Sequence, residues 1–505
     1  MNQKLLLLSA STLVLNSFAK PKDSKPNVII ILADDLGYGD LSACGASTIH
    51  TPNIDKLANN GVRFTNGYAT SATSTPSRYA MFTGMYPWRN KDAKILPGDA
   101  PLLISESQYT LPKLMKDAGY ATAAIGKWHL GMGNGNVDWN KPITPGPKEV
   151  GFDYSNLIAA TNDRTPTVFV ENGKVVGLKA DDPIQVNYKK NFEGEPTAKT
   201  NPEMLKMQWS HGHNQSIHNG IPRIGFQKGG KNAMWVDEDM ADYFTCIAKN
   251  FLNENKEKPF FMYFGLHQPH VPRVPNARFV GKSGMGPRGD AILEADWCVG
   301  EIMAELDKLG LSENTMVIFS SDNGPVLDDG YKDQAKELLG NHKPAGALRG
   351  GKYSLYDGGT HVPFIVFWKN RVKPTVSNAL VCQMDFLASI STLIKQPLKG
   401  NFDSENVLPA LLGQSEKGRT ELVVEANGKL AFRTENWAFI PSYAGPQTNE
   451  TGNEIGIFSE SALFNLKTDI GQVENLADKN TYQLEKMKIR FDAITKVYPL
   501  TNKVQ

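Results

Sequence analysis

The sequence has few cysteines and, beyond its first twenty residues, no long apolar run. Only 4 of its 505 residues are cysteine, too few and too scattered for a disulfide framework or a zinc site, so free buried thiols are expected and one disulfide pair stays open. No segment after residue 20 is long and apolar enough to span a bilayer. The formal net charge is +1, with the two signs well mixed, so nothing favours nucleic acid or an anionic membrane as a partner.

The first 19 residues have the pattern of a signal peptide. Lys4 precedes an apolar stretch that includes Leu5–Leu8, and Ser17 and Ala19 are small residues at the −3 and −1 positions of a cleavage site. This pattern predicts cleavage after Ala19 and export to the periplasm or out of the cell, with residues 20–26 as a polar linker.

Five continuous apolar runs are typical of strands buried on both faces of a parallel sheet. Amphipathic helical patterns at residues 109–119, 236–255 and 292–309 alternate with them. The alternation predicts an α/β fold, with a large, mostly parallel sheet between two layers of helices. The five runs are residues 27–33, 121–126, 260–266, 316–321 and 362–368.

The pattern changes twice along the chain. Residues 161–235 are rich in Gly, Pro, Asn and Lys and are weakly periodic, which predicts long loops with short strands, either shaping access to a site or simply solvated. Beyond residue 400 the runs are shorter, and a smaller α+β domain is expected over residues 401–505, after a main domain over 20–400. Its predicted elements are strands at 421–424, 429–433 and 436–440 and a helix at 482–498.

Four of the apolar runs end in polar side chains. Ligands of open α/β sheets bind beyond the carboxyl ends of the strands, so these side chains are expected to form one site. Two of the clusters consist of oxygen donors only, which suits Ca²⁺ or Mg²⁺ rather than zinc. The clusters are Asp34-Asp35, Lys127-Trp128-His129, His267 with His270, and Asp322-Asn323.

A stretch of small hydroxyl residues leads into a predicted helix at Ser74. Pro76 suits the first turn of a helix, because the N–H that proline lacks would have no hydrogen-bond partner within the helix there. Ser74 would then stand at the positive end of the helix dipole, and Arg78 lies one turn further along the chain. This arrangement indicates a hydroxyl at an anion site with a cation beside it, although a Ser/Thr-Pro sequence is also an ordinary helix cap.

The motif Ser74-x-Pro76-Ser77-Arg78, followed by Thr83-Gly84, resembles the signature of the type I sulfatases. In that family the first residue, Cys or Ser, is oxidised after translation to Cα-formylglycine. The resemblance implies that Ser74 is the modified residue, and its being Ser implies a radical-type maturation enzyme of anaerobic bacteria. It also implies an alkaline-phosphatase-like fold, in which a mixed, mostly parallel sheet is sandwiched by helices.

Other segments resemble the family in the same order along the chain. Gly126–Gly131 resembles its second signature, while Pro269–Pro272 and Leu348–Lys352 match segments that carry a catalytic His and a sulfate-binding Lys. The resemblance covers residues 26–480. It implies one Ca²⁺ bound by Asp34, Asp35, Ser74, Asp322 and Asn323, sulfate contacts from Arg78, Lys127 and Lys352, an aldehyde hydrate oriented or deprotonated by His129, and a leaving alcohol protonated by His270.

The resemblance implies an exported sulfuric ester hydrolase acting on a sulfated glycan. Asp99–Leu102, Gly151–Tyr154 and the His-rich insertion are similar to segments of bacterial enzymes that remove sulfate from galactose or N-acetylgalactosamine, so a galacto-configured sugar is expected. The sulfated hydroxyl, exo or endo action and the oligomeric state are left open. Residues proposed as additional sugar contacts are His211, His213 and Arg273.

Two other functions are compatible with parts of this pattern. A phosphatase or phosphodiesterase of the same superfamily would use two zinc ions and several His ligands, typically with a His directly after the later Asp, where this chain has Asn323. A catalytically silent relative that binds sulfated glycans would keep the anion pocket but leave Ser74 unoxidised. The sequence leaves this second alternative open.

Overall fold

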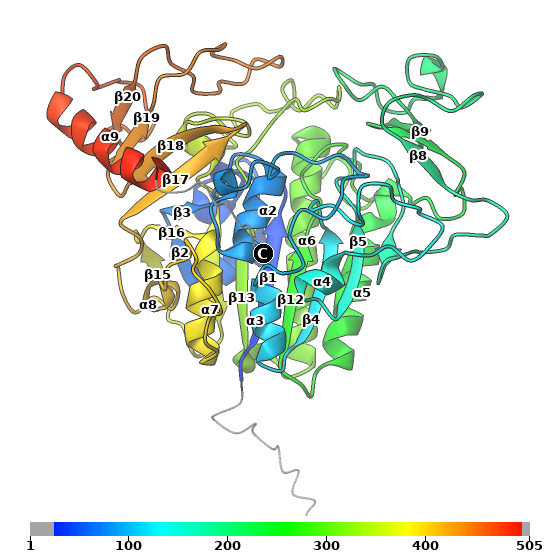
Figure 1. The fold of residues 1–505 in the computed structure, drawn as a ribbon, viewed down its shortest axis with the longest axis horizontal. Coiled ribbons are helices and arrows are strands. Elements are labelled where there is room, and N and C mark those ends of the chain that lie inside the picture. The colour runs from blue at the N-terminus through cyan, green and yellow to red at the C-terminus, as the bar shows by residue number, and fades with distance from the viewer. Residues whose placement is uncertain (1–24, 497–505) are drawn as a thin grey trace, which may run out of the picture.

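The computed structural model describes residues 25–496, so the predicted signal peptide lies outside the described residues. Figure 1 shows a large central sheet with helices packed around it, a smaller unit of strands and one helix at the upper left, and loops at the upper right. In spatial order the large sheet contains β15 (Thr375–Ser377), β2 (Val62–Phe64), β14 (Phe364–Trp368), β13 (Thr315–Ser321), β1 (Asn27–Ala33), β12 (Phe260–Gly265), β4 (Ala121–Lys127), β5 (Tyr154–Ile158), β6 (Val170–Glu171) and β7 (Lys174–Val175).

The centre of the large sheet is parallel. β13, β1, β12, β4 and β5 run in one direction, as the pairs Ile29↔Val317 and Ile29↔Met262 illustrate for β1 and its two neighbours. β14 is antiparallel to β13, and β6 and β7 add antiparallel strands at the other end. The predicted α/β fold with a mixed, mostly parallel sheet is therefore confirmed, and all five predicted runs form strands.

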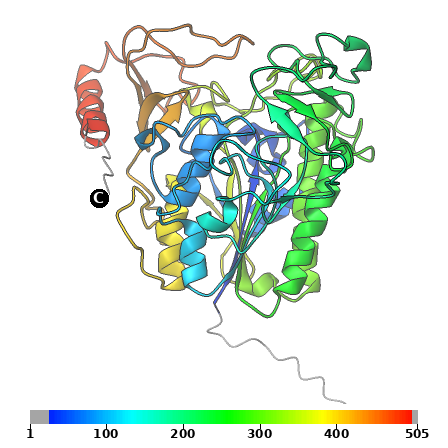
Figure 2. The ribbon, with the colours of Figure 1, turned by 45° about the vertical axis from the view of Figure 1, so that its right-hand side comes forward.

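Successive residues of β1 face two different cores. Val28 and Ile30 pack into one core and Ile29 and Ile31 into the other, all fully buried. Each such side chain contributes about 1.5–3 kcal/mol by leaving water, which explains why a buried strand is apolar without alternation. Figure 2 shows the two helical layers edge-on. One layer contains α2 (Ser74–Thr83), α3 (Leu111–Asp117), α4 (Pro147–Val150), α7 (Phe386–Ile394) and α8 (Leu408–Leu411); the other contains α1 (Pro52–Asn60), α5 (Met240–Glu254) and α6 (Gly286–Lys308).

The smaller unit is a four-stranded antiparallel sheet covered by one helix, as predicted for the end of the chain. It touches the main sheet's helical layer at the segment before α2, where Ser71 bridges Glu425. Val407 and Leu411 still pack in the core of the large sheet, and the domain boundary at residue 400 stays a prediction. The unit contains β17 (Glu421–Ala426), β18 (Lys429–Thr434), β19 (Trp437–Ile440), β20 (Ala462–Asn465) and α9 (Thr481–Lys496).

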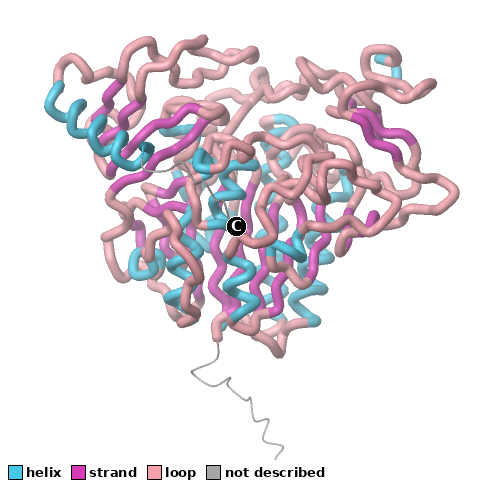
Figure 3. The backbone as a smooth tube through the Cα atoms, in the orientation of Figure 1, coloured by secondary structure: helices cyan, strands magenta, loops and turns pink. Residues whose placement is uncertain are grey.

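Residues 161–235 form mostly loops, in line with their composition. Figure 3 shows this part of the backbone, at the upper right, as long loops with a few short strands. Among the described residues, no helix is both long and apolar enough to cross a membrane. The remaining short strands form the pairs β3 (Gly67–Tyr68) with β16 (Val381–Cys382), β8 (Gln185–Asn187) with β11 (Phe226–Lys228), and β9 (Ile217–His218) with β10 (Ile221–Pro222).

Two details differ from the sequence-based expectation. α6 begins at Gly286 rather than near residue 292. Pro287 lies in its first turn, where a proline is tolerated, whereas a proline in the sequence usually indicates a loop. The four cysteines, all within the described residues, are free, but only Cys298 and Cys382 are buried, while Cys246 is exposed.

Asp296 of α6 makes the stability of the fold depend on pH. Its carboxylate accepts the backbone N–H groups of Asn53 and Ile54 at 3.0 and 2.8 Å, at the start of α1. Burial raises the pKa of Asp296 from 3.8 to about 6. Because the folded-state pKa lies above the unfolded one, ionisation opposes folding by up to about 3 kcal/mol, a penalty absent below about pH 4 and complete above about pH 6.

We expect Asp296→Asn to flatten this dependence. Relative to the unsubstituted protein, the variant should gain about 2–3 kcal/mol in unfolding free energy between pH 4 and pH 8, because the amide cannot ionise. Urea unfolding followed by circular dichroism at the two pH values measures the difference. Parallel stability curves for the two proteins would show that Asp296 is ionised without penalty.

Candidate active site

Ser74 is the first residue of α2 and faces the carboxyl ends of the central strands. Thr73 before it is extended, with φ −148° and ψ 151°, and Gly84 ends the helix in the left-handed region at φ 64°, which glycine adopts without strain. All ten helix residues are buried. Thr75 and Ser77 donate their hydroxyls to the backbone carbonyls of His129 and Ser71, so those two hydroxyls secure the helix, while that of Ser74 lies in the polar site.

The Ser74 hydroxyl lies between the amine of one lysine and two side-chain oxygens. The amine of Lys127 donates to its Oγ at 2.9 Å. Oδ1 of Asp34 lies 3.3 Å from the same Oγ, and Oδ1 of Asn323 lies 3.5 Å from it. These partners lie at the carboxyl ends of β4, β1 and β13, three of the strand ends that the sequence pattern expects to meet at one edge of the sheet.

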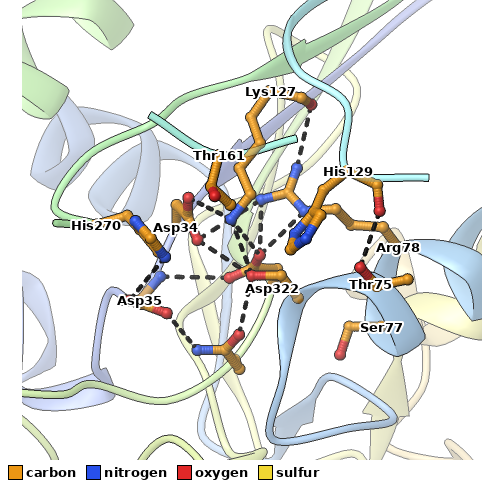
Figure 4. Close-up of polar contacts among 12 residues, drawn as sticks. Asp34, Asp35, Thr75, Ser77, Arg78, Lys127, His129, Thr161, His270 and Asp322 are labelled. Carbon is orange, nitrogen blue, oxygen red and sulfur yellow. Dashed lines mark hydrogen bonds and ion pairs between the residues drawn. The ribbon is translucent and has the colours of Figure 1, made fainter. Parts of the chain in front are cut away.

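Two fully buried cations balance the carboxylates next to Ser74 (Figure 4). Lys127 Nζ lies 2.5 Å from Asp34 Oδ2. Arg78 donates through Nη2 and Nε to Asp322 Oδ2 at 2.6 and 3.0 Å, and it also donates to the hydroxyl of Tyr263. A buried pair of this kind is costly to break, because the remaining charge would have no partner.

Asp35 and Lys352 form the opposite side of the site. Lys352 Nζ lies 2.9 Å from Asp35 Oδ2 and 2.7 Å from Asp329 Oδ2. Asn323 donates its amide to Asp35 Oδ1 at 2.8 Å, and His270 Nε2 lies 3.9 Å from Asp35 Oδ2. Residues from the ends of β1, β4, β12 and β13 are therefore in one cluster.

The local charges shift the protonation of the carboxylates in opposite directions. Burial raises the pKa of Asp34 well above its usual value, and the nearby Asp322 and Asp35 add to the rise against the opposing effect of Lys127. Burial would also raise the pKa of Asp322, but Arg78 and Lys127 outweigh it and the pKa is lowered. The raised pKa of Asp34 therefore comes mainly from its removal from water, whereas the pKa of Asp322 is governed by its two neighbouring cations.

The oxygen donors in this cluster fit a hard divalent cation. Side-chain oxygens of Asp34 and Asn323 both face the Ser74 hydroxyl. Asp35 accepts from the Asn323 amide through Oδ1, and Asp322 accepts the backbone N–H of Asp35 through Oδ1. One carboxylate oxygen each of Asp34 and Asp35 and a ring nitrogen of His270 lie within 4.8 Å of one another. With four oxygen donors and one imidazole at the edge, the chemistry suits Ca²⁺ or Mg²⁺ better than zinc.

The two histidines of the site have different free nitrogens. His129 Nε2 lies 3.0 Å from the carbonyl of Leu96, while its Nδ1 has no hydrogen-bond partner among the described residues. His270 Nδ1 lies 2.6 Å from the carbonyl of Val271, which leaves Nε2 facing Asp35. Burial lowers the pKa of both rings well below the usual value, helped at His129 by Lys127 and at His270 by Lys352. Both are neutral near pH 7.

A pocket next to Ser74 brings in residues that the sequence argument missed. Asp163 accepts from His213 Nε2 and from Arg164, both at 2.8 Å. Asp163 and Arg164 follow β5, so the strand-end rule would have found them had the mixed sequence of β5 been recognised as a strand. The pocket is lined by Ser74, Ile95, His129, Asp163, Arg164, His213, His270, Asp329, Lys352 and Tyr353.

The three predicted sugar contacts are placed differently. His213 lines the pocket. His211 lies beside it, with 6.1 Å between the ring centroids and about a third of its side chain exposed. Arg273 is buried and outside the pocket lining, with its guanidinium bound to Asp333 and to the carbonyls of Pro269, Val326 and Leu327. His267, left without a role by the sequence, is also outside that lining.

Comparison with known proteins gives consistent matches. The sulfatase family model matches residues 26–395. The chain is 51% identical over 461 residues to an N-acetylgalactosamine-6-O-sulfatase of Bacteroides thetaiotaomicron, covering 90% of each chain, and 29% identical to human arylsulfatase A, covering 89% of this chain and 83% of that one.

The solved structures agree with the sequence matches. A Bacteroides thetaiotaomicron protein, solved in work on the metabolism of multiple glycosaminoglycans, superposes with a TM-score of 0.92 at 49% identity, covering 94% of this chain and 100% of that one. The family model spans well over half of the chain, and the first relative is matched along nearly its whole length. The protein described here is a member of the sulfatase family.

Proposed function

We propose that this protein is exported and hydrolyses the O-sulfate ester of a sulfated glycan, specifically the 6-O-sulfate of N-acetylgalactosamine or galactose. The observation that carries the proposal is the Ser74 hydroxyl, held between the Lys127 amine and the oxygens of Asp34 and Asn323, in a pocket also lined by His270 and Lys352. The 51% identity to an N-acetylgalactosamine-6-O-sulfatase supports the choice of sugar and position.

The proposal includes two groups that the chain acquires. A radical-type maturation enzyme would oxidise Ser74 to formylglycine, and Asp34, Asp35, Asp322, Asn323 and position 74 would hold one Ca²⁺. When formed and hydrated, the aldehyde would supply a nucleophilic hydroxyl for sulfur and a second hydroxyl for release of sulfate, and Ca²⁺ would withdraw charge from the sulfate oxygens.

The cations of the chain bind the sulfate and stabilise the charge that develops on it. Lys127 touches position 74, and Lys352 lines the pocket from the opposite side. Arg78 is further from the pocket and orients Asp322. These charges are fixed by buried partners before the substrate arrives, so little reorganisation is needed in the transition state.

The two histidines move protons at different atoms. Nδ1 of His129 is free to accept a proton, and His129 lines the same pocket as Ser74, so His129 acts as the base for position 74. His270 Nε2 takes up a proton when the anionic sulfate binds, since a nearby negative charge favours the imidazolium form. It then gives this proton to the oxygen of the leaving sugar.

Three residues of the pocket lining would select the sugar. Asp163 and Arg164 present a carboxylate and a guanidinium, and His213 is fixed by Asp163. This alternation of acceptors and donors suits adjacent sugar hydroxyls, because an unpaired buried polar group would penalise a sugar of the wrong configuration.

The decisive experiment combines a mass and an activity. Protein produced in an anaerobic host with its maturation enzyme is digested with trypsin, and the peptide from Phe64 to Arg78 should be about 2 Da lighter than its sequence mass. That protein should release sulfate from 6-O-sulfated N-acetylgalactosamine or galactose in preference to 4-O-sulfated or gluco-configured sugars. Binding of these sugars without the mass change or turnover would support the silent sulfoglycan-binding relative instead.

The metal requirement is tested by removal and return. Dialysis against EDTA should lower activity at least about tenfold and lower the melting temperature, because a bound cation stabilises the folded state by up to about 4 kcal/mol at a thousandfold excess over its Kd. Ca²⁺ should restore both properties. Full activity after verified metal removal, or restoration by Zn²⁺ alone, would contradict the assignment and favour a zinc phosphodiesterase-like site.

A further inference from the structure

The segment that carries His270 is fixed at both ends by one buried carboxylate. This segment, residues 268–276, lies in the chain between β12 and α6. Glu294 of α6 accepts the side-chain N–H of Gln268 at 2.9 Å through Oε2 and the backbone N–H of Asn276 at 2.9 Å through Oε1. Both Glu294 and Gln268 are 2% exposed, so neither bond competes with water.

Gln268 connects this carboxylate to the reacting groups. Its backbone carbonyl accepts the N–H of Asp34 at 3.0 Å. Two residues further along the chain is His270, which is 4% exposed and lines the pocket with Ser74. A shift of Gln268 would therefore move both the histidine and the end of β1.

A second anchor keeps the segment folded without Glu294. Arg273, in the middle of the segment, is bound to Asp333 and to the carbonyls of Val326 and Leu327. Loss of the Glu294 contacts is therefore expected to displace the ends of the segment rather than unfold it.

We propose that Glu294 is a positioning residue that holds the imidazole of His270 in line with the leaving-group oxygen, through its bonds to Gln268 and Asn276. The inference rests on the proposed function, in which His270 protonates that oxygen. General acid catalysis contributes about 10²–10⁴-fold, and displacement of a catalytic group by about 1 Å costs about 10²-fold. The effect belongs in kcat, since the sulfate and sugar contacts remain.

The side chain of Gln268 makes a conservative rescue available. Its Oε1 has no hydrogen-bond partner among the described residues. In Glu294→Gln, rotation of the Gln268 amide would let this oxygen accept the new N–H₂ group, while the remaining oxygen still accepts from Asn276. Glu294→Ala can make neither bond. The glutamine variant should therefore keep the two contacts, and with them the kcat, that the alanine variant loses.

Asp296 provides a matched control on the same helix. It is 3% exposed and also accepts backbone N–H groups, but those of α1 rather than of the His270 segment. The experiment compares Glu294→Ala, Glu294→Gln and Asp296→Ala in matured protein by kcat and KM on the sulfated sugar. It also compares the imidazole NMR signals of His270 in the absence of substrate.

We expect Glu294→Ala to lower kcat about 10–100-fold with KM within about threefold, and Glu294→Gln to stay within about threefold in kcat. Asp296→Ala should lower the melting temperature but leave kcat within about threefold. The His270 signals should shift in Glu294→Ala only. An unchanged kcat in Glu294→Ala, an equal loss in Asp296→Ala, or unshifted His270 signals would overturn the proposal. An unsubstituted enzyme inactive on sulfated sugars would instead overturn the proposed function, and the NMR comparison would still decide the role of Glu294.

Discussion

Ser74→Ala is expected to abolish sulfate release, by at least about 10⁴-fold in kcat, while the protein stays folded. The substitution removes the hydroxyl, without which Cβ cannot be oxidised to the aldehyde and no oxygen at this position can attack sulfur. Loss of a nucleophile that works with a base and charged groups has effects of this size. The lost contacts of the hydroxyl with Lys127, Asp34 and Asn323 should change the unfolding free energy by no more than about 1–3 kcal/mol.

A serine of the same helical layer serves as the control. Ser389 of α7 is fully buried and its hydroxyl accepts the N–H of Val407 at 3.0 Å, remote from the polar site. Ser389→Ala should lose a similar amount of stability and keep full kcat. Sulfate release is followed by ion chromatography, and folding by circular dichroism. If Ser74→Ala kept more than a tenth of the original kcat, position 74 would not take part in the reaction.

Arg78→Ala should damage both stability and activity. The guanidinium makes two bonds to Asp322, and without it a fully buried carboxylate remains beside Asp34. Breaking a buried pair from one side costs about 3–5 kcal/mol. Loss of the orientation of Asp322 and of a nearby positive charge should lower kcat by about 10²–10³-fold.

A second buried ion pair, Arg419–Asp385, is the control that separates the loss of stability from the loss of activity. Arg419 is buried and lies 2.5 Å from the fully buried Asp385, at the junction with the smaller sheet. Arg419→Ala should lose comparable stability in urea unfolding, with kcat per folded molecule within about threefold. Should Arg78→Ala fail to fold, Arg78→Lys keeps one charge and should lose kcat with a smaller loss of stability. Equal kcat in the Arg78 and Arg419 variants would mean that Arg78 has a structural role only.

The sequence predicted the parts of the site that lie at the ends of apolar strands. Asp34, Lys127 and Asp322 directly follow uninterrupted apolar runs, and parallel strands bring such ends to one edge of the sheet. Asp163 was missed because β5 contains serine and asparagine, so its hydrophobic pattern is short and mixed. The strand order and the antiparallel β14 depend on pairing between distant segments, which local patterns do not encode.

Contacts between segments that are distant in the sequence also determine where the predicted sugar-binding residues lie. An arginine in a loop suggests an exposed charge, yet three of the four acceptors that hold Arg273 inside the protein lie within residues 326–333, and only the carbonyl of Pro269 belongs to its own segment. Lys352 was expected from its motif, but its second partner, Asp329, lies in a loop without recognisable periodicity. Motifs identify such residues, while only the tertiary structure supplies their partners.

The complete burial of α2 limits when the proposed oxidation of residue 74 could occur. On the proposed function, an enzyme that oxidises residue 74 would have to reach it before α2 is enclosed, so oxidation would compete kinetically with folding. The segment before α2 is completed only when it pairs with Glu425 of β17. At 5–20 residues per second, the roughly 350 residues between them take about 20–70 s to synthesise. The proposed modifying enzyme would therefore have tens of seconds before β17 is synthesised, and a truncation before β17 should lengthen that interval.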